Sequence, residues 1–277
     1  MPSLFDPPPA GLPAGGGGVG RPAGDATAPV ILHPALWHAH QLARPGGSVR
    51  PSRFAELDTA LPGGGWPTQA LTELLLPHPG LGELRLLAPA LVAVQAAGGS
   101  LMWFDPPAAP CAWALGALGI DTGQLVVVHP RQALRGPARQ RLPAADVLWA
   151  LEQALKSGHV GAVLAWLPAR LPADTLRRLQ LAAQAHDGPA FLLRDVAARQ
   201  QPSAAPLRLL LAAAGPDRLR VTVVKRRGPP LAQPLYLALP PVLSPAGLAR
   251  ALAGRVPPAS GVAVAGAAAA VAALQAP

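Results

Sequence analysis

One segment of the chain has the layout of a phosphate-binding loop. The segment is LLLPHPGLGELRLL (residues 74–87), in which an apolar run, a turn rich in Gly and Pro, and a helix-like stretch follow one another. N–H groups at a helix N-terminus bind phosphate, and the P-loop sequence Gly-x4-Gly-Lys-[Ser/Thr] adds a lysine for the phosphates and a hydroxyl for Mg²⁺. Counted back from Gly82, the first glycine position is Pro77, the lysine position is Glu83 and the hydroxyl position is Leu84.

These substitutions predict that the loop has lost its nucleotide chemistry. A carboxylate at the lysine position repels a γ-phosphate, and a leucine cannot ligate a metal ion. The chain's two lysines, Lys156 and Lys225, lie outside any Gly-Lys-[Ser/Thr] sequence. We therefore expect no nucleotide cofactor, no metal and no catalytic residue. The positions of this degenerate P-loop are Pro77, Gly80, Gly82, Glu83 and Leu84.

A second group that nucleoside triphosphatases need is also missing. They hold Mg²⁺ through an Asp at the end of a buried strand. The apolar run 161–167 instead ends in Ala-Trp-Leu, which places Trp166 at the expected ligand-facing edge. Its indole offers either a stacking surface for a partner or a base, or ordinary packing at the edge of the sheet.

Basic residues follow three of the expected strands. If they converge, they form an electrostatic track for single-stranded DNA or for an acidic face of a partner protein. Few aromatic residues are interleaved with them, and the alternative is a solvated basic surface. The candidate contacts are Arg131, Arg135, Arg139 and Arg141, then Arg170, Arg177 and Arg178, and finally Lys225, Arg226 and Arg227.

Other chemistries find less support in the residues. No Gly-x-Ser-x-Gly sequence is present, so a hydrolase nucleophile elbow is not expected. His38 and His40 have no accompanying cluster of acids or cysteines, and His129 has no evident acid or nucleophile beside it. The single cysteine, Cys111, excludes an internal disulfide and a cysteine-based zinc site.

Composition favours a folded protein with an acidic partner. The chain has 277 residues, 51% hydrophobic and 13% charged, with a formal net charge of +9. Apart from two lysines its cations are arginines, which suit phosphate contacts, although a GC-rich genome gives the same enrichment. The first 20 residues lack the features of a signal peptide, and the apolar tail 261–277 is too short and Ala-rich for a membrane span. We expect a cytoplasmic protein without a membrane partner.

Apolar runs alternate with helix-like segments, as in α/β proteins built on a parallel sheet. A Pro/Gly-rich lead of residues 1–33 is expected to be disordered, residues 34–243 form one domain, and residues 244–277 form an Ala/Pro-rich tail with one helix-prone piece. A short helix is expected at 34–42. Strands are expected at 70–76, 100–105, 125–129, 160–167 and 190–193, with an antiparallel extension at 206–212, 219–225 and 235–239; helices are expected from Glu83, at 109–118, at 146–156 with Asp146 as N-cap, and at 174–185.

Several of these segments together resemble a known family. The run RFAELDTALPGGGWPTQALTELLL (residues 53–76) is similar to the entry segment of RecA-type recombinases, and VTVVKRR (residues 221–227) is similar to a late RecA strand. With the degenerate loop, GAVLAWLP (161–168) and RRLQLAA (177–183), the pattern is similar to ImuA, the RecA-like and often SulA-annotated family of bacterial damage-inducible translesion cassettes. The resemblance covers residues 34–243.

This resemblance implies a RecA-like fold and a non-catalytic accessory role in SOS-induced translesion DNA synthesis. The implied partners are an ImuB-like Y-family polymerase homologue, RecA, an error-prone C-family polymerase and DNA itself, with recruitment to the nucleoid after damage. RecA's catalytic glutamate falls on Pro107, and the first of its two DNA-binding loops, after Leu167, is shortened. The alternatives are a SulA-like inhibitor that binds a tubulin-like division GTPase, and a regulator that still binds ATP.

Overall fold

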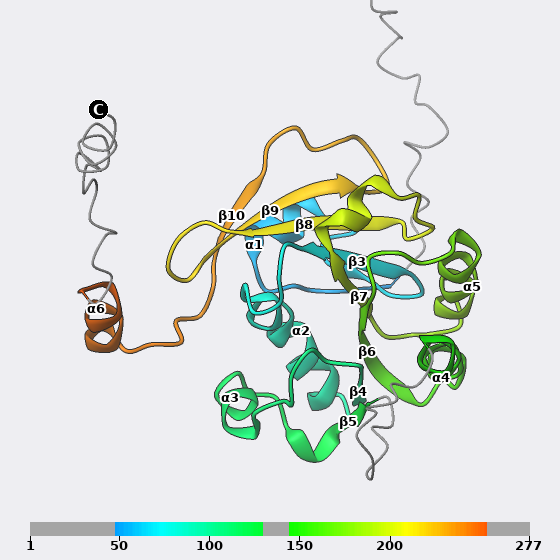
Figure 1. Cartoon of the computed structure of the whole chain (residues 1–277), viewed down its shortest axis with the longest axis horizontal. Coiled ribbons are helices and arrows are strands. Elements are labelled where there is room, and N and C mark those ends of the chain that lie inside the picture. Colours follow the sequence, from blue (N-terminus) through cyan, green and yellow to red (C-terminus); the bar gives the residue numbers. More distant parts are fainter. Residues whose placement is uncertain (1–47, 130–143, 254–277) are drawn as a thin grey trace, which may run out of the picture. The chain divides into compact units, whose positions relative to one another are not determined.

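The core of the protein is one eight-stranded mixed sheet. A computed structural model describes residues 48–129 and 144–253 (Figure 1). The strand order is β10-β9-β8-β3-β7-β6-β4-β5, in which the last six strands of this order are mutually parallel and β9 and β10 are antiparallel to their neighbours. The strands are β3 (Leu71–Leu76), β4 (Ser100–Phe104), β5 (Leu125–Val128), β6 (Val160–Leu167), β7 (Ala190–Asp195), β8 (Leu207–Ala213), β9 (Arg218–Lys225) and β10 (Leu235–Ala238). The expected mainly parallel α/β sheet with an antiparallel extension is confirmed, but β8, which was expected in the extension, runs parallel to β3, so the extension begins at β9.

Helices cover both faces of this sheet (Figure 1). One core joins α2 and α1 to one face, and the other core joins α4 and α5 to the opposite face. The helices are α1 (Ala55–Ala60), α2 (Glu83–Ala96), α3 (Ala112–Ala117), α4 (Ala144–Lys156), α5 (Ala173–Ala183) and α6 (Pro245–Ala253), with 3-10 turns η1 (Thr122–Gln124) and η2 (Val196–Gln200). Helix α4 begins at Ala144, so Asp146 lies in its first turn, and the prediction that Asp146 is the N-cap is wrong.

Alternation of side chains along β3 explains how the two cores form. All six residues of β3 are buried, and Leu74 and Leu76 pack in the core beneath α2, whereas Leu71 packs beneath α4 and α5. Successive side chains of a strand point to opposite faces of a sheet, so a continuous apolar run fits a strand that is covered on both faces. A buried strand was expected at 70–76. The observed strand is buried throughout and begins one residue later, at Leu71.

A small antiparallel sheet, formed by β1 (Val49–Arg50) and β2 (Trp66–Pro67), precedes β3 in the chain. Its Trp66 is fully buried and meets the ring of Phe191 edge-on, with 5.2 Å between ring centroids. Neither strand nor helix α1 was expected from the sequence, because two-residue strands and a six-residue helix are too short to show a periodic pattern. The short helix expected at 34–42, and His38 and His40, lie outside the described residues.

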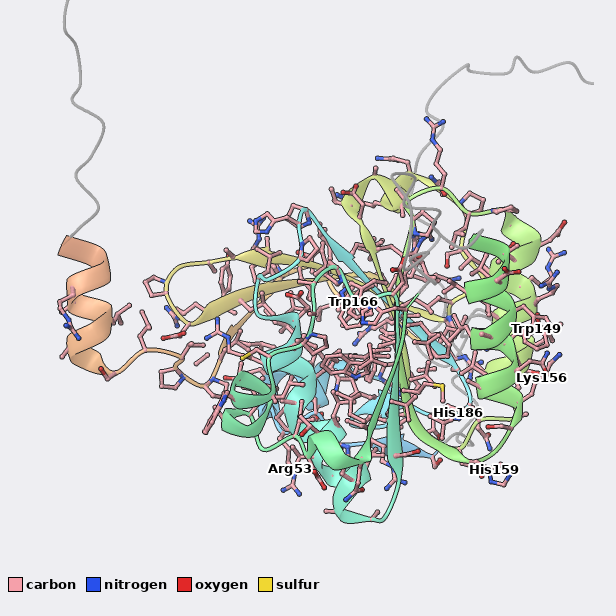
Figure 2. All side chains as sticks on the ribbon, turned by 60° about the horizontal axis from the view of Figure 1, so that its bottom comes forward. Arg53, Trp149, Lys156, His159, Trp166 and His186 are labelled. Atoms are coloured by element: carbon pink, nitrogen blue, oxygen red, sulfur yellow. The ribbon has the colours of Figure 1, made fainter. Side chains whose placement is uncertain are left out.

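A buried histidine lies between α5 and β7. His186 is 1% exposed, and neither of its ring nitrogens has a hydrogen-bond partner in the described part of the chain (Figure 2). Burial lowers the pKa of His186, an effect that the nearby Pro189 carbonyl and the Asp187 carboxylate oppose. The folded protein therefore favours the neutral ring.

We expect this histidine to make stability pH-dependent. In the unfolded chain the ring takes up a proton near its usual pKa of about 6.5, whereas the folded state resists protonation. The free energy of unfolding should therefore be highest above that pH and should fall as the pH drops below it. Urea unfolding between pH 7.5 and 5.5 measures this slope, which should shrink in His186→Phe and persist in the control His159→Gln, at an exposed histidine. An unchanged slope in His186→Phe would contradict the assignment.

Candidate functional site

The turn between β3 and α2 holds its own anion. Glu83, the first residue of α2, is 4% exposed, and its carboxylate bends back over the turn. The Gly80 N–H donates to Oε1 at 2.8 Å and the Gly82 N–H donates to Oε2 at 3.1 Å. A carboxylate is also favoured here by the positive end of the helix dipole. Backbone N–H groups of the type that receive phosphate in a P-loop are thus bonded to a side chain of the same turn.

Neighbouring residues fix the shape of this turn. Gly82 has φ +110°, a conformation that favours glycine, and a Cβ placed on it would lie 2.6 Å from Leu239 Cδ1, so that side chain would have to shift. Arg85, in the first turn of α2, forms an ion pair with Asp217 and donates to the Pro240 carbonyl at 3.1 Å. The turn is therefore connected to the β8–β9 turn and to the chain that leaves β10.

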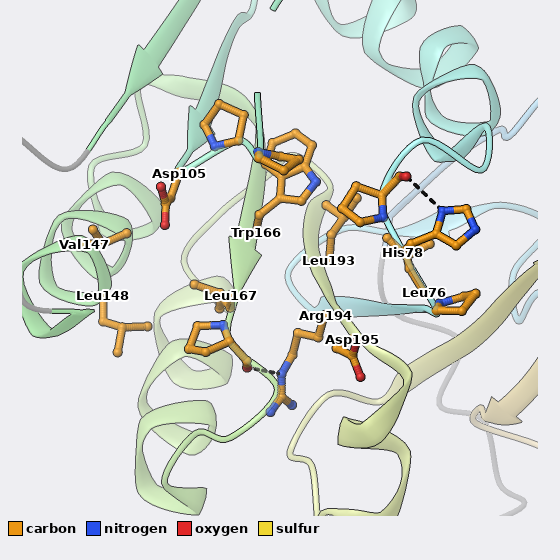
Figure 3. A pocket seen from close by; sticks show the side chains of 15 residues that line it. Leu76, His78, Asp105, Val147, Leu148, Trp166, Leu167, Leu193, Arg194 and Asp195 are labelled. Atoms are coloured by element: carbon orange, nitrogen blue, oxygen red, sulfur yellow. Dashed lines mark hydrogen bonds between the residues drawn. The ribbon is translucent and has the colours of Figure 1, made fainter. Parts of the chain in front are cut away.

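A cavity of about 580 Å³ opens beside this turn, at the carboxyl ends of β3, β4, β6 and β7 (Figure 3). Five of the lining residues are prolines, and most of the others are apolar. Ligands bind at the carboxyl ends of strands in open α/β sheets, and the volume is within the usual range for such sites. The lining is Leu76, Pro77, His78, Pro79, Asp105, Pro106, Pro107, Val147, Leu148, Trp166, Leu167, Pro168, Leu193, Arg194 and Asp195.

Trp166 is part of both the wall and the core. Its ring meets that of Trp103 edge-on, with 5.5 Å between centroids and 63° between planes, and it also lines the cavity. Its Nε1–H is buried and has no hydrogen-bond partner among the described residues. Trp166 therefore packs at this edge of the sheet, which is one of the two interpretations of the sequence, and its indole also lines the cavity.

Two carboxylates on the wall were not among the expected site residues. Asp105 directly follows β4 and has φ +48°, a conformation that Asp and Asn tolerate better than most residues. Asp195 ends β7, and its Oδ1 accepts from the Ala197 N–H at 2.7 Å. The sequence shows that each follows an apolar strand, but the order of the strands, which brings them to one cavity, is not visible in it.

A buried cluster of three charges lies below the cavity. Glu73, in β3, is fully buried and bridges the guanidinium groups of Arg194 and Arg208. Arg194 also donates to the carbonyls of Pro168, at 3.3 Å, and Ala169, at 2.6 Å. Arg194 lines the cavity, but its guanidinium group is paired with Glu73 and its N–H groups donate to neighbouring protein oxygens.

Of the basic residues singled out in the sequence, Arg131, Arg135, Arg139 and Arg141 lie outside the described residues. Arg170 is exposed in the β6–α5 loop. Arg177 and Arg178 lie on the exposed side of α5; Arg177 is 3.9 Å from Asp174, and Arg178 is 3.0 Å from Glu152 of α4. Lys156 also pairs with Glu152, and its hydrogen bond and that of Arg178 lower the pKa of the carboxyl.

The basic end of β9 makes different contacts. Lys225 donates to the Ser203 carbonyl at 2.9 Å, and partial burial, together with the charge of Arg208, lowers its pKa. Arg226 donates to the carbonyls of Pro229, at 2.6 Å, and Ala60, at the end of α1. Arg227 is exposed.

Within the described residues, these basic side chains do not form one continuous track. Helix α1, which Arg226 contacts, packs on one face of the sheet, and α5, which carries Arg177 and Arg178, packs on the other. Trp149, on α4, is 63% exposed (Figure 2), and it lies three residues before Glu152, the α4 residue that Arg178 of α5 contacts. This leaves a local basic and aromatic surface on α4 and α5.

Within the described residues, no three His, Cys, Asp or Glu side chains gather closely enough to hold a metal ion. The same part of the chain contains no helix with the length and apolar character needed to span a bilayer. No protein-family model matches the chain, and a search of curated proteins finds no match either.

Proposed function

We propose that this chain is a non-catalytic accessory protein of damage-inducible translesion DNA synthesis, similar to ImuA, that acts by binding partners. The proposal joins the sequence resemblance over residues 34–243 to one observation about the loop. The Glu83 carboxylate accepts the N–H groups of Gly80 and Gly82, so a side chain of the protein stands at the place of a nucleotide phosphate.

The remaining loop positions support binding without hydrolysis. Leu84 packs against the core beneath α2, and Pro77 contributes to the cavity wall. Neither residue can hold Mg²⁺ or a phosphate. Both side chains are aliphatic, and Pro77 also lacks a backbone N–H. A RecA-like domain altered in this way keeps its surfaces and its cavity for recruitment.

The proposed partners follow the resemblance. They are an ImuB-like Y-family polymerase homologue first, then RecA and an error-prone C-family polymerase, with DNA as a further ligand. The exposed surface on α4 and α5, with Trp149, Arg177 and Arg178, is the described region best suited to an acidic partner or a DNA strand.

A nucleotide titration tests the loss of cofactor binding. We expect no saturable binding of a fluorescent ATP analogue with Mg²⁺ up to about 1 mM, since the internal carboxylate repels the γ-phosphate. A catalytically competent P-loop ATPase under the same conditions provides the positive control. Saturable micromolar binding, or ATP turnover that changes with Glu83, would overturn this part of the proposal.

A pull-down from DNA-damaged cells tests the cellular role. Tagged full-length protein should retain a Y-family polymerase homologue and the C-family polymerase, and more of both after damage than before. Recovery of a tubulin-like division GTPase without any translesion component would favour the SulA-like alternative. A chain carrying exchanges on the α4–α5 surface, Trp149→Ala and Arg178→Ala, serves to show whether that surface takes part.

A further inference from the structure

The cavity beside the β3–α2 turn has the opposite electrostatic character to a phosphate site. The N–H groups of Gly80 and Gly82 are bonded to Glu83, and the guanidinium of Arg194 is paired with Glu73. Among the described residues that line the wall, the ionised groups that remain are the carboxylates of Asp105 and Asp195. Asp195 uses Oδ1 for the Ala197 N–H, which leaves its second oxygen, and no described residue donates to the Asp105 carboxylate.

The proline residues of the wall reinforce this character. A proline has a carbonyl oxygen but no N–H, so a wall built from five of them offers acceptors and few donors. The wall has two other polar side-chain groups: His78, whose Nδ1 lies 3.1 Å from the Pro79 carbonyl, and the Nε1–H of Trp166, which is a donor. A ligand that donates hydrogen bonds and carries positive charge fits such a wall, whereas an anion does not.

The aromatic part of the wall narrows the choice of cation. Trp166 lines the cavity between the ends of β4 and β7, with Asp105 on one side and Asp195 on the other (Figure 3). A guanidinium group stacks on an indole and donates several planar hydrogen bonds to carboxylates and carbonyls at once, whereas an ammonium group is a more strongly hydrated point charge. The arrangement therefore favours arginine over lysine.

We propose that this cavity receives an arginine side chain of a protein partner, with its guanidinium group held over Trp166 and between Asp105 and Asp195. This inference rests on the proposed function, in which the chain acts by binding partners. It adds the chemistry by which one partner is recognised. Charge complementarity identifies the occupant: the wall presents two carboxylates, and the anion-binding groups of the turn are already bonded.

The probe for this site is N-acetyl-arginine amide, with N-acetyl-citrulline amide as the uncharged control of nearly the same shape. Binding to the full-length chain is followed by NMR on the indole N–H of Trp166, whose signal is identified by its absence in Trp166→Phe. The arginine compound should shift this signal saturably, with a Kd in the millimolar range expected for a single side chain and weaker binding at high salt. The citrulline compound should leave the signal in place.

Charge-neutral variants locate the site. In Asp105→Asn the amide tolerates the same left-handed backbone, and in Asp195→Asn the side-chain oxygen still accepts from Ala197. Each exchange should weaken binding by about threefold to fivefold, the range that one partly exposed ion pair supplies, and the double variant by roughly tenfold or more. The control Asp174→Asn, on the exposed side of α5, should leave the Kd unchanged.

Three results would overturn the proposal: no saturable shift of the Trp166 signal, an equal shift with citrulline, or undiminished binding in the double variant. Circular dichroism of the variants shows whether the fold is retained. These outcomes are separate from those of the pull-down. A translesion partner bound without any arginine binding refutes the cavity assignment alone, and arginine binding without a translesion partner refutes the cellular role alone.

Discussion

Replacing Glu73 with glutamine is expected to destabilise the protein strongly. The exchange keeps the shape of the side chain but leaves Arg194, fully buried, and Arg208, nearly so, without their counter-ion. Breaking a buried ion pair from one side costs about 3–5 kcal/mol, because a charge remains without compensation in a medium of low dielectric constant. Chemical unfolding at pH 7 measures the loss, and a melting temperature lower by roughly 10 °C is expected for a chain of this size.

Glu152 provides a matched control for this experiment. It also bridges two cations, Lys156 and Arg178, but both cations are at least half exposed. Glu152→Gln should cost less than about 1 kcal/mol, because solvent screens the pairs. If Glu73→Gln does not fold, replacing Glu73 by Leu and both buried arginines by Met should restore folding, since apolar side chains can replace a buried ion cluster. Equal effects of the two glutamine exchanges would contradict the account.

Replacing Glu83 with alanine is expected to do two things at once. It should lower the free energy of unfolding by about 2–4 kcal/mol, because two hydrogen bonds to a charged group are lost. It should also expose two N–H groups at a helix N-terminus, where an anion is favoured. Added phosphate should then stabilise Glu83→Ala by about 1 kcal/mol at a concentration of several times its Kd, and the wild type by much less. Thermal unfolding in phosphate and in chloride of equal ionic strength measures the difference.

Glu56, an exposed glutamate in the first turn of α1, is the control for this exchange. Glu56→Ala should change stability by no more than about 0.5 kcal/mol and should show no phosphate effect. A phosphate effect of the same size in the wild type would mean that Glu83 does not occupy the anion position, and the central observation behind the proposed function would be lost.

Long apolar patterns were sufficient to predict the strands of the main sheet, although not their order. The expected strand at 160–167 has the observed bounds, and the helix from Glu83 begins at the expected residue. The antiparallel extension was visible because the turn residues 215–217 separate two alternating runs. The helix expected at 109–118 is shorter, Ala112–Ala117, and begins after Pro110, which disfavours a helical conformation of the residue before it.

The candidate site was only partly predictable. The loop positions followed from spacing, and electrostatic repulsion by Glu83 was expected, but its bonds to Gly80 and Gly82 depend on a backbone turn that spacing does not specify. The cavity required the order β3-β7-β6-β4, which brings Asp105 and Asp195 together from segments 90 residues apart. Arg208 fell within the expected strand 206–212 and Arg194 directly after the expected strand 190–193, and nothing local in the sequence shows that Glu73 lies between them.

The proline wall has a consequence for the kinetics of recognition. Each proline holds its backbone φ near −65°. The wall segments therefore have little torsional freedom to lose when a ligand binds; their prolines are Pro77, Pro79, Pro106, Pro107 and Pro168. If an arginine side chain binds here as proposed, the wall should lose little conformational entropy on association, and we expect binding without a slow rearrangement of the wall. Differences in affinity between ligands should then lie mainly in their dissociation rates.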